Sequence, residues 1–201
     1  MKRAVIFDFG NVICSFDLQQ FIRRISPHST RPLSGLLQLI PSFTEIAREY
    51  ETGLMSSNEF FGEVCRRADL AISRDEFIKA YCEIFTPIQS TFDLIRSLKH
   101  RYRLGLMSNT NEWHYLYGIR PVAVFPLFDA VTLSFEVKAM KPARPMYDDI
   151  LTKLAMRPGE CAFVDDLQEN VDAARSLGID AILYTDAEHL LTSLRRVGIT
   201  C

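Results

Sequence analysis

Residues 3–12 of the sequence, Arg-Ala-Val-Ile-Phe-Asp-Phe-Gly-Asn-Val, contain the feature that decides the fold. An unbroken apolar run over residues 4–7 ends at Asp8, and a glycine and an asparagine soon follow. A continuous apolar run is typical of a strand buried on both faces, as in a parallel sheet covered by helices. Open α/β sheets bind ligands beyond the carboxyl ends of their strands, so the polar turn is also a candidate site.

Four later apolar runs have the same character, and helical patterns separate them. The runs cover residues 104–108 (LGLMS), 130–134 (AVTLS), 161–165 (CAFVD) and 180–184 (DAILY). The helical patterns cover residues 91–102, 143–156, 168–177 and 187–197. Strands that alternate with helices in this way predict an α/β fold with a Rossmann-like, doubly wound parallel sheet.

Residues 17–86 interrupt this alternation, because they contain no convincing strand but several helix starts. Ser56 with Glu59, and Ser73 with Glu76, fit the Ser-x-x-Glu capping box that begins helices. Apolar residues at helical spacing follow both boxes. We therefore expect an inserted helical cap domain. The expected domains are a helical cap, residues 17–86, and an α/β core, residues 1–16 and 87–201.

Composition and charge place the chain among ordinary globular proteins. Of its 201 residues, 48% are hydrophobic and 24% are charged, and the formal net charge is −2. This charge gives no electrostatic reason to expect a nucleic acid or a membrane as partner. The first apolar run is shorter than the roughly 7–15 residues of a signal-peptide core, and no stretch approaches the roughly 20 apolar residues of a membrane span. No pattern predicts an oligomeric state.

Cysteine usage indicates a reducing compartment. The five cysteines are odd in number, scattered and never arranged as a C-x-x-C pair. This pattern argues against a disulfide framework and against a cysteine zinc site, so we expect a cytoplasmic protein. Cys14 lies near the first polar turn in the sequence, and we interpret it as a small buried hydrophobe.

Polar clusters follow four parts of the predicted sheet. They are Asp8-Phe9-Gly10-Asn11-Val12, Ser108-Asn109-Thr110, Lys141-Pro142 and Asp165-Asp166. Each cluster alone has an ordinary explanation, because such residues also form turns and cap helices. Chance explains their joint occurrence poorly, since all four fall in order along one predicted fold. We therefore expect these side chains to form one ligand site at the carboxyl edge of the sheet.

The stretches FDFGNVI, MSNTN, MKPARPMY and FVDDLQEN resemble, in order, the four motifs of the haloacid dehalogenase superfamily of hydrolases. The helix-rich insert lies where that superfamily carries its helical cap. The residues in these motifs are most similar to those of the glucose-1-phosphate phosphatase-like group and of the phosphatase domain of soluble epoxide hydrolase. The resemblance covers nearly the whole chain and implies a hydrolase.

The resemblance implies a role for each motif. Asp8 is then the nucleophile, and it forms an aspartyl-phosphate intermediate. Lys141 places a positive charge against Asp8 and the phosphoryl oxygens, while Ser108 and the backbone N–H of Asn109 donate hydrogen bonds where charge develops. These roles suit the chemistry, because a phosphate dianion repels a carboxylate unless cations neutralise the site.

The resemblance also implies a magnesium site. Its ligands would be Asp8, the backbone carbonyl of Gly10 and one of Asp165 and Asp166, of which we favour Asp166. A ligand set made of oxygen atoms suits this hard cation. The expected cofactor is Mg²⁺, and the expected partner is a small phosphorylated substrate.

Several nearby residues have two possible interpretations. We prefer Lys141 to Lys138 as the functional lysine, because prolines after Lys141 give it a rigid, non-helical setting. Asn170 either supports the site from behind or lies exposed on a helix. Trp113 and His114 follow the second motif, and we interpret His114 as a histidine in a surface loop rather than as a neighbour of the substrate.

The sequence departs from the superfamily at Gly10. Most phosphatases of the superfamily have a second Asp at this position, which protonates the leaving oxygen and then activates water. A positioned acid–base group contributes about 10²–10⁴-fold to a rate, so its absence leaves a gap in the mechanism. Without it, substrates with acidic leaving groups, such as sugar 1-phosphates, should react best unless Glu49 or Glu51 in the cap supplies a proton.

Three functions therefore stay open. The chain is a phosphatase of a small phosphate monoester such as a sugar phosphate, or a dehalogenase, or a scaffold of the same fold without catalysis. The pair Asp165-Asp166 argues against a dehalogenase, because a carboxylate that attacks an alkyl halide needs no divalent cation. Retention of Asp8, Ser108 and Lys141 together argues against a scaffold. We favour the phosphatase.

Overall fold

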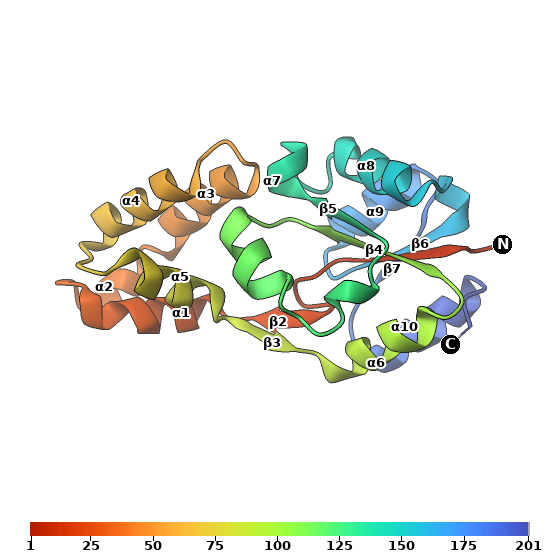
Figure 1. The fold of residues 1–201 in the computed structure, drawn as a ribbon, viewed down its shortest axis with the longest axis horizontal. Coiled ribbons are helices and arrows are strands. Elements are labelled where there is room, and N and C mark those ends of the chain that lie inside the picture. Colours follow the sequence, from red (N-terminus) through yellow and green to blue (C-terminus); the bar gives the residue numbers. More distant parts are fainter. Residues whose placement is uncertain (201) are drawn as a thin grey trace.

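A five-stranded parallel sheet forms the centre of the computed structural model, which describes residues 1–200 (Figure 1). The strands lie in the order β5-β4-β1-β6-β7, so the first strand of the chain is the middle one. Neighbouring strands in this sheet are parallel. Their bounds are Ala4–Phe7 (β1), Arg103–Ser108 (β4), Ala130–Leu133 (β5), Cys161–Asp165 (β6) and Asp180–Leu183 (β7). The predicted α/β fold with a parallel sheet is confirmed.

Helices cover both faces of this sheet (Figure 1). On one face lie α8 (Arg144–Leu154) and α9 (Gln168–Ser176), and on the other lie α6 (Gln89–Leu98) and α10 (Ala187–Arg196). Strand β1 contacts both layers: Val5 and Phe7 pack in the cluster with α6 and α10, and Ala4 and Ile6 pack in the cluster with α8 and α9. Successive strand side chains point to opposite faces, so a strand covered on both sides must be apolar throughout.

Five helices fill the chain between two short strands (Figure 1). They are α1 (Leu18–Ile25), α2 (Leu33–Leu37), α3 (Ile40–Glu51), α4 (Ser57–Ala68) and α5 (Arg74–Cys82). The strands, β2 (Cys14–Phe16) and β3 (Phe85–Pro87), pair antiparallel outside the main sheet. The five helices bury a separate hydrophobic cluster. The division into domains at residues 16/17 and 86/87 stays a prediction.

Both predicted capping boxes are formed. At the start of α4 the Ser56 N–H donates to the Glu59 carboxylate (2.8 Å), and the Glu59 N–H donates to the Ser56 hydroxyl. Ser73 and Glu76 repeat the arrangement at α5. Each box satisfies two backbone donors that the first turn of a helix otherwise leaves unpaired.

Several short elements are not predicted by the sequence pattern. They are β2 and β3, helix α7 (Ser134–Val137), a π-helix (His114–Ile119) and single 3₁₀ turns at Ser26–His28, Phe125–Leu127 and Pro158–Glu160. Elements of three to six residues are shorter than the window in which periodicity can be recognised. Helix α6 also ends at Leu98 rather than at residue 102, and beyond it the N–H groups of Arg101 and Tyr102 share the Leu98 carbonyl oxygen.

Within residues 1–200, no helix has both the length and the apolar character needed to cross a membrane.

The turn after α3 attaches the helical segment to the core beside α7. The Ser134 hydroxyl donates to the Glu51 carbonyl oxygen (2.6 Å), and the Lys138 ammonium donates to the Gly53 carbonyl oxygen (2.8 Å). Gly53 has φ +65°, a left-handed conformation that favours glycine. A Cβ atom at Gly53 would also collide with the Phe135 carbonyl and the Lys138 amino group. Glycine is therefore required at this junction.

Gly53→Ala should lower the free energy of unfolding by at least about 1–2 kcal/mol, the cost of left-handed backbone for a residue with a Cβ. Gly62→Ala is the matched control, because Gly62 lies in α4 and a Cβ there would meet no atom within 4 Å. That control should gain up to about 1 kcal/mol from helix propensity. Urea unfolding of both variants measures the difference, and equal stabilities would contradict the strained junction.

Candidate active site

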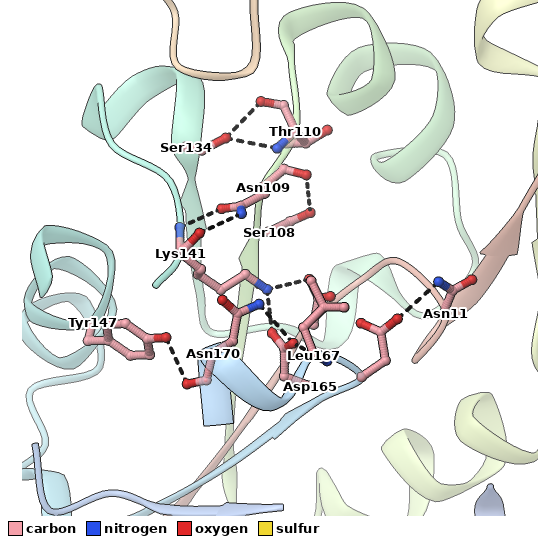
Figure 2. A network of polar contacts seen from close by, with 12 residues as sticks. Asn11, Ser108, Asn109, Thr110, Ser134, Lys141, Tyr147, Asp165, Leu167 and Asn170 are labelled. Carbon is pink, nitrogen blue, oxygen red and sulfur yellow. Dashed lines mark hydrogen bonds and ion pairs between the residues drawn. The ribbon is translucent and has the colours of Figure 1, made fainter. Parts of the chain in front are cut away.

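The four sequence clusters meet at the carboxyl edge of the sheet, as predicted. Asp8 directly follows β1, Ser108 ends β4 and Asp165 ends β6. Lys141 lies in the loop between α7 and α8, and its side chain extends toward the strand ends (Figure 2). Parallel strands place their carboxyl ends on one edge, so residues more than 150 positions apart in the sequence become neighbours.

A buried ammonium group joins two buried carboxylates. Lys141 Nζ lies 2.7 Å from Asp8 Oδ1 and 2.6 Å from Asp165 Oδ2. Burial raises the pKa of Asp8 to about 7, although the charge of Lys141 opposes this shift. Burial alone would lower the pKa of Lys141, but Asp8 and Asp165 outweigh it and raise the pKa. Lys141 is therefore charged and holds its place between the two carboxyl groups.

The two acidic residues of the last motif have different surroundings. Asp165 is fully buried, and its Oδ1 accepts hydrogen bonds from the Leu167 N–H and the Asn170 amide (both 2.9 Å), while its Oδ2 faces Lys141 (Figure 2). Asp166 is partly exposed and accepts one hydrogen bond, from the Asn11 amide (3.0 Å). The oxygen atoms of Asp165 are thus occupied, whereas Asp166 keeps acceptor capacity.

Three carboxyl groups lie close enough to share a cation. One oxygen each from Asp8, Asp165 and Asp166 lies within 4.8 Å of the others. Asn170 is buried against this cluster and donates to Asp165. Of its two interpretations, the one in which it supports the site from behind therefore agrees with the structure, and the exposed position does not. The Asn170 Oδ1 is buried and, within residues 1–200, has no hydrogen-bond donor.

Lys138 does not reach this cluster, because its ammonium group bonds to Gly53 at the junction with the helical segment. The preference for Lys141 over Lys138 therefore agrees with the positions of the two side chains.

Asn109 has a positioning contact that sequence reasoning missed. Its side-chain Oδ1 accepts the Lys141 backbone N–H (2.7 Å), and its Nδ2 donates to the Lys141 carbonyl (3.1 Å) (Figure 2). The amide therefore fixes the backbone that carries the lysine. The neighbouring Ser108 is 3% exposed. The sequence does not reveal the amide contact, because Asn109 and Lys141 are 32 positions apart.

Two cavities lie beside one another at this edge of the sheet, and they share part of their walls. The larger, about 300 Å³, contains Asp8, Lys141 and Asp166 in its wall. The smaller, about 100 Å³, is lined by aromatic and aliphatic side chains from both parts of the chain and by Ser108. Four residues line both cavities: Gly10, Phe16, Glu51 and Asn109. A compound that fills both would therefore touch Asp8 and the helical segment together.

His114 is not in a surface loop, so that interpretation is wrong. It lies in the π-helix, stacks on the Tyr81 ring with centroids 4.1 Å apart, and places Nε2 3.0 Å from the Tyr81 carbonyl oxygen. Burial lowers the pKa of His114 to about 4, so the imidazole is neutral near pH 7. It lines the smaller cavity, and Trp113 beside it is buried in the helical cluster. Cys14 is buried, as expected.

Comparison with known proteins identifies relatives of this chain, some by sequence and some by structure. D-ribitol-5-phosphate phosphatase of Bacteroides thetaiotaomicron is 27% identical over 194 residues, which are 90% of each chain. Bifunctional epoxide hydrolase 2 of Rattus norvegicus is 34% identical over 70 residues, 35% of this chain and 13% of that protein. The structure of a haloacid dehalogenase family enzyme from Bacteroides thetaiotaomicron, a magnesium complex, has a TM-score of 0.80 at 24% identity, covering 94% of this chain and 98% of the other. This last similarity shows a shared fold.

The family model of the haloacid dehalogenase-like hydrolases matches residues 2–178, which include all four motifs and the helical segment. The protein is a member of the haloacid dehalogenase-like hydrolase family.

Proposed function

We propose that the protein is a magnesium-dependent phosphatase that hydrolyses a small phosphate monoester through an aspartyl-phosphate at Asp8. The observation that carries this proposal is the buried Lys141 ammonium group between Asp8 and Asp165, in the wall of a cavity. Such a group lowers the repulsion between a carboxylate nucleophile and a phosphate dianion. The curated phosphatase relative supports the same reaction class.

Each residue then has a defined part in the first step. A carboxylate oxygen of Asp8 forms a bond to phosphorus while the bond from phosphorus to the leaving oxygen breaks. Lys141 neutralises Asp8 before attack and the phosphoryl oxygens during it. The Ser108 hydroxyl and the Asn109 backbone N–H donate to the transferring group. Water then attacks phosphorus, which releases phosphate and restores Asp8.

The donor set at this edge fits Mg²⁺. Oxygen ligands are the ones this hard cation prefers, and three carboxyl groups meet here. The hydrogen bonds around Asp165 leave Asp166, Asp8 and the Gly10 carbonyl as the groups we expect to hold the ion. Asp165 then acts mainly by orienting Lys141. When bound, Mg²⁺ supplies positive charge beside the phosphoryl oxygens.

The unpaired oxygen of Asn170 supports this assignment. A buried acceptor without a donor costs roughly 1–3 kcal/mol, so its persistence needs an explanation. Asn170 lines the same cavity as Asp8 and Asp166. Protein-bound Mg²⁺ usually keeps several waters, and their O–H groups would supply the donor.

The substrate class follows from the size and lining of the two cavities. Their volumes, about 300 and 100 Å³, fit a phosphate group and a leaving group of a few carbon atoms. Glu51, Asn109, Thr110 and His114 offer polar contacts in the smaller one. We therefore infer a sugar or sugar-alcohol phosphate, which the activity named for the relative supports.

The other two functions are less consistent with the site. A dehalogenase has no use for a cation site, yet Asp166 keeps free acceptor capacity beside Asp8. Among the described residues, the buried Lys141 ammonium group pairs with two carboxylates, those of Asp8 and Asp165. A scaffold without catalysis would gain nothing from this arrangement. We place the protein in the cytoplasm, because Cys14, Cys65, Cys82 and Cys161 are free thiols.

Asp8→Asn should reduce phosphate release by roughly 10⁴–10⁶-fold, because an amide cannot act as the carboxylate nucleophile. The fold should persist, since the substitution preserves size. The control is Asp17→Asn, which replaces the N-cap of α1 by an equally good capping residue. Phosphate release from an aryl phosphate measures both, and wild-type activity in Asp8→Asn would contradict the assignment of the nucleophile.

Mg²⁺ should raise the melting temperature of the wild type and of Asp172→Ala, but much less that of Asp166→Ala. Binding to the folded state alone stabilises it by about 2.7 kcal/mol at 100 times the dissociation constant. Asp172 is an exposed residue of α9 and makes a suitable control. Thermal unfolding with Mg²⁺ or EDTA gives the shifts. Equal shifts in all three proteins, or full activity in EDTA, would exclude the proposed metal site.

A further inference from the structure

The core offers no proton donor where the superfamily usually has one. Gly10 lacks a side chain, and a Cβ built there would lie 3.4 Å from the Phe16 ring. A Cβ therefore fits, but the aromatic ring bounds the space in which a longer acidic side chain would extend. Without an acid the leaving oxygen would depart as an alkoxide, which is slow for an ordinary alcohol.

One acidic side chain of the helical segment adjoins both cavities. Among the described acidic residues in 17–86, only Glu51 lines the cavity with Asp8 and the cavity with Ser108. The other candidate from the sequence, Glu49, is exposed and lines neither. The last residue of α3 thus borders both the cavity that contains Asp8 and the cavity beside it.

Hydrogen bonds tie Glu51 to the second motif. The Ser134 hydroxyl donates to the Glu51 carbonyl (2.6 Å), and the Thr110 N–H donates to the same hydroxyl oxygen (2.8 Å). Thr110 follows Ser108 and Asn109 directly, so one serine links the cap residue to the phosphate-binding turn. The carboxyl group of Glu51 itself has no hydrogen bond or ion pair within residues 1–200.

The surroundings of Glu51 favour its acid form. Burial raises the pKa of Glu51 to about 7, and Arg48 on the same helix lowers it by a smaller amount. The Tyr81 phenol of α5 and the His114 imidazole of the π-helix face the same region, and both are neutral near pH 7. Lys138 of the loop after α7 is engaged by the Gly53 carbonyl. A carboxyl group with this pKa can still carry a proton near neutral pH, unlike an ordinary exposed glutamate.

We propose that Glu51 is the proton donor to the leaving oxygen, in place of the acid missing at Gly10. The inference rests on the proposed phosphatase function. As Asp8 bonds to phosphorus, the electron pair of the breaking P–O bond goes to the leaving oxygen, which takes the Glu51 proton and departs as an alcohol. The Glu51 carboxylate then accepts a proton from the water that attacks the phosphorus of the aspartyl-phosphate. Asp8 leaves as a carboxylate, and Glu51 is again protonated.

This assignment extends the substrate class. Phosphates of primary alcohols become competent substrates, since the leaving oxygen no longer has to carry a full charge. The preference for sugar 1-phosphates, expected for a site without an acid, is then lost. A donor on the helical segment also couples proton transfer to the contacts that select the leaving group.

The test compares Glu51→Gln with the control Glu49→Gln. Both residues lie in α3, but Glu51 borders the two cavities and Glu49 is exposed to solvent. Single-turnover rates are measured with glycerol 3-phosphate, whose leaving group is a primary alcohol, and with p-nitrophenyl phosphate, whose leaving group needs no proton. Glu51→Gln should lose about 10²–10⁴-fold on the first substrate and less than about tenfold on the second. Glu49→Gln should match the wild type on both. In the wild type, Asp8 must lose its proton and Glu51 must keep its own, so the rate on glycerol 3-phosphate should pass through a maximum near pH 7 and fall at higher pH. Glu51→Gln should lack the fall on the alkaline side.

Equal losses on the two substrates in a folded Glu51→Gln, or no loss on either, would overturn the role of Glu51 while leaving the phosphatase function intact. If Glu51→Gln does not fold, the ratio of the two rates is taken from Glu51→Ala and Glu51→Asp, and an unchanged ratio in both overturns the role. A wild type that releases no phosphate from p-nitrophenyl phosphate would instead refute the proposed function, and with it this inference.

Discussion

The buried contact of Lys141 with Asp8 and Asp165 is the interaction on which the site depends. Three carboxyl groups meet at the sheet edge, and burial already raises the pKa of Asp8 to about 7. Without the ammonium group, like charges would face one another in a medium of low dielectric constant. Breaking such a buried pair from one side typically costs about 3–5 kcal/mol. The two hydrogen bonds between the Asn109 side chain and the Lys141 backbone, one in each direction, therefore join the second and third motifs into a single unit.

The sheet topology explains why this contact can form. Strand β1 lies between β4 and β6, so Asp8 has Ser108 on one side and Asp165 on the other. The helical segment then closes the edge, with Glu51 and Phe16 in the walls of the cavities. Enclosure strengthens every charge interaction within the site, because it replaces water by a medium of lower dielectric constant.

Local patterns made the fold and most of the site predictable. Apolar runs and their polar ends are properties of adjacent residues, so the sequence alone places Asp8, Ser108 and Asp165 at strand ends. Contacts between distant residues could not be predicted. The burial of His114 depends on Tyr81, and the support of Lys141 depends on the Asn109 side chain. Neither contact has a signature in the sequence, because packing alone brings the two partners together.

Glu49 and Glu51 show most clearly where sequence reasoning ends. They lie two positions apart on α3, and either could have supplied a proton. Ser134 and Gly53 fix how the end of α3 meets the core, and this packing turns Glu51 toward the cavities while Glu49 stays in solvent. On the proposed mechanism, the acid has moved from the core to the segment that contacts the leaving group. Changes in that segment would then alter substrate choice and proton transfer together, whereas the phosphate-binding edge of the sheet could remain the same.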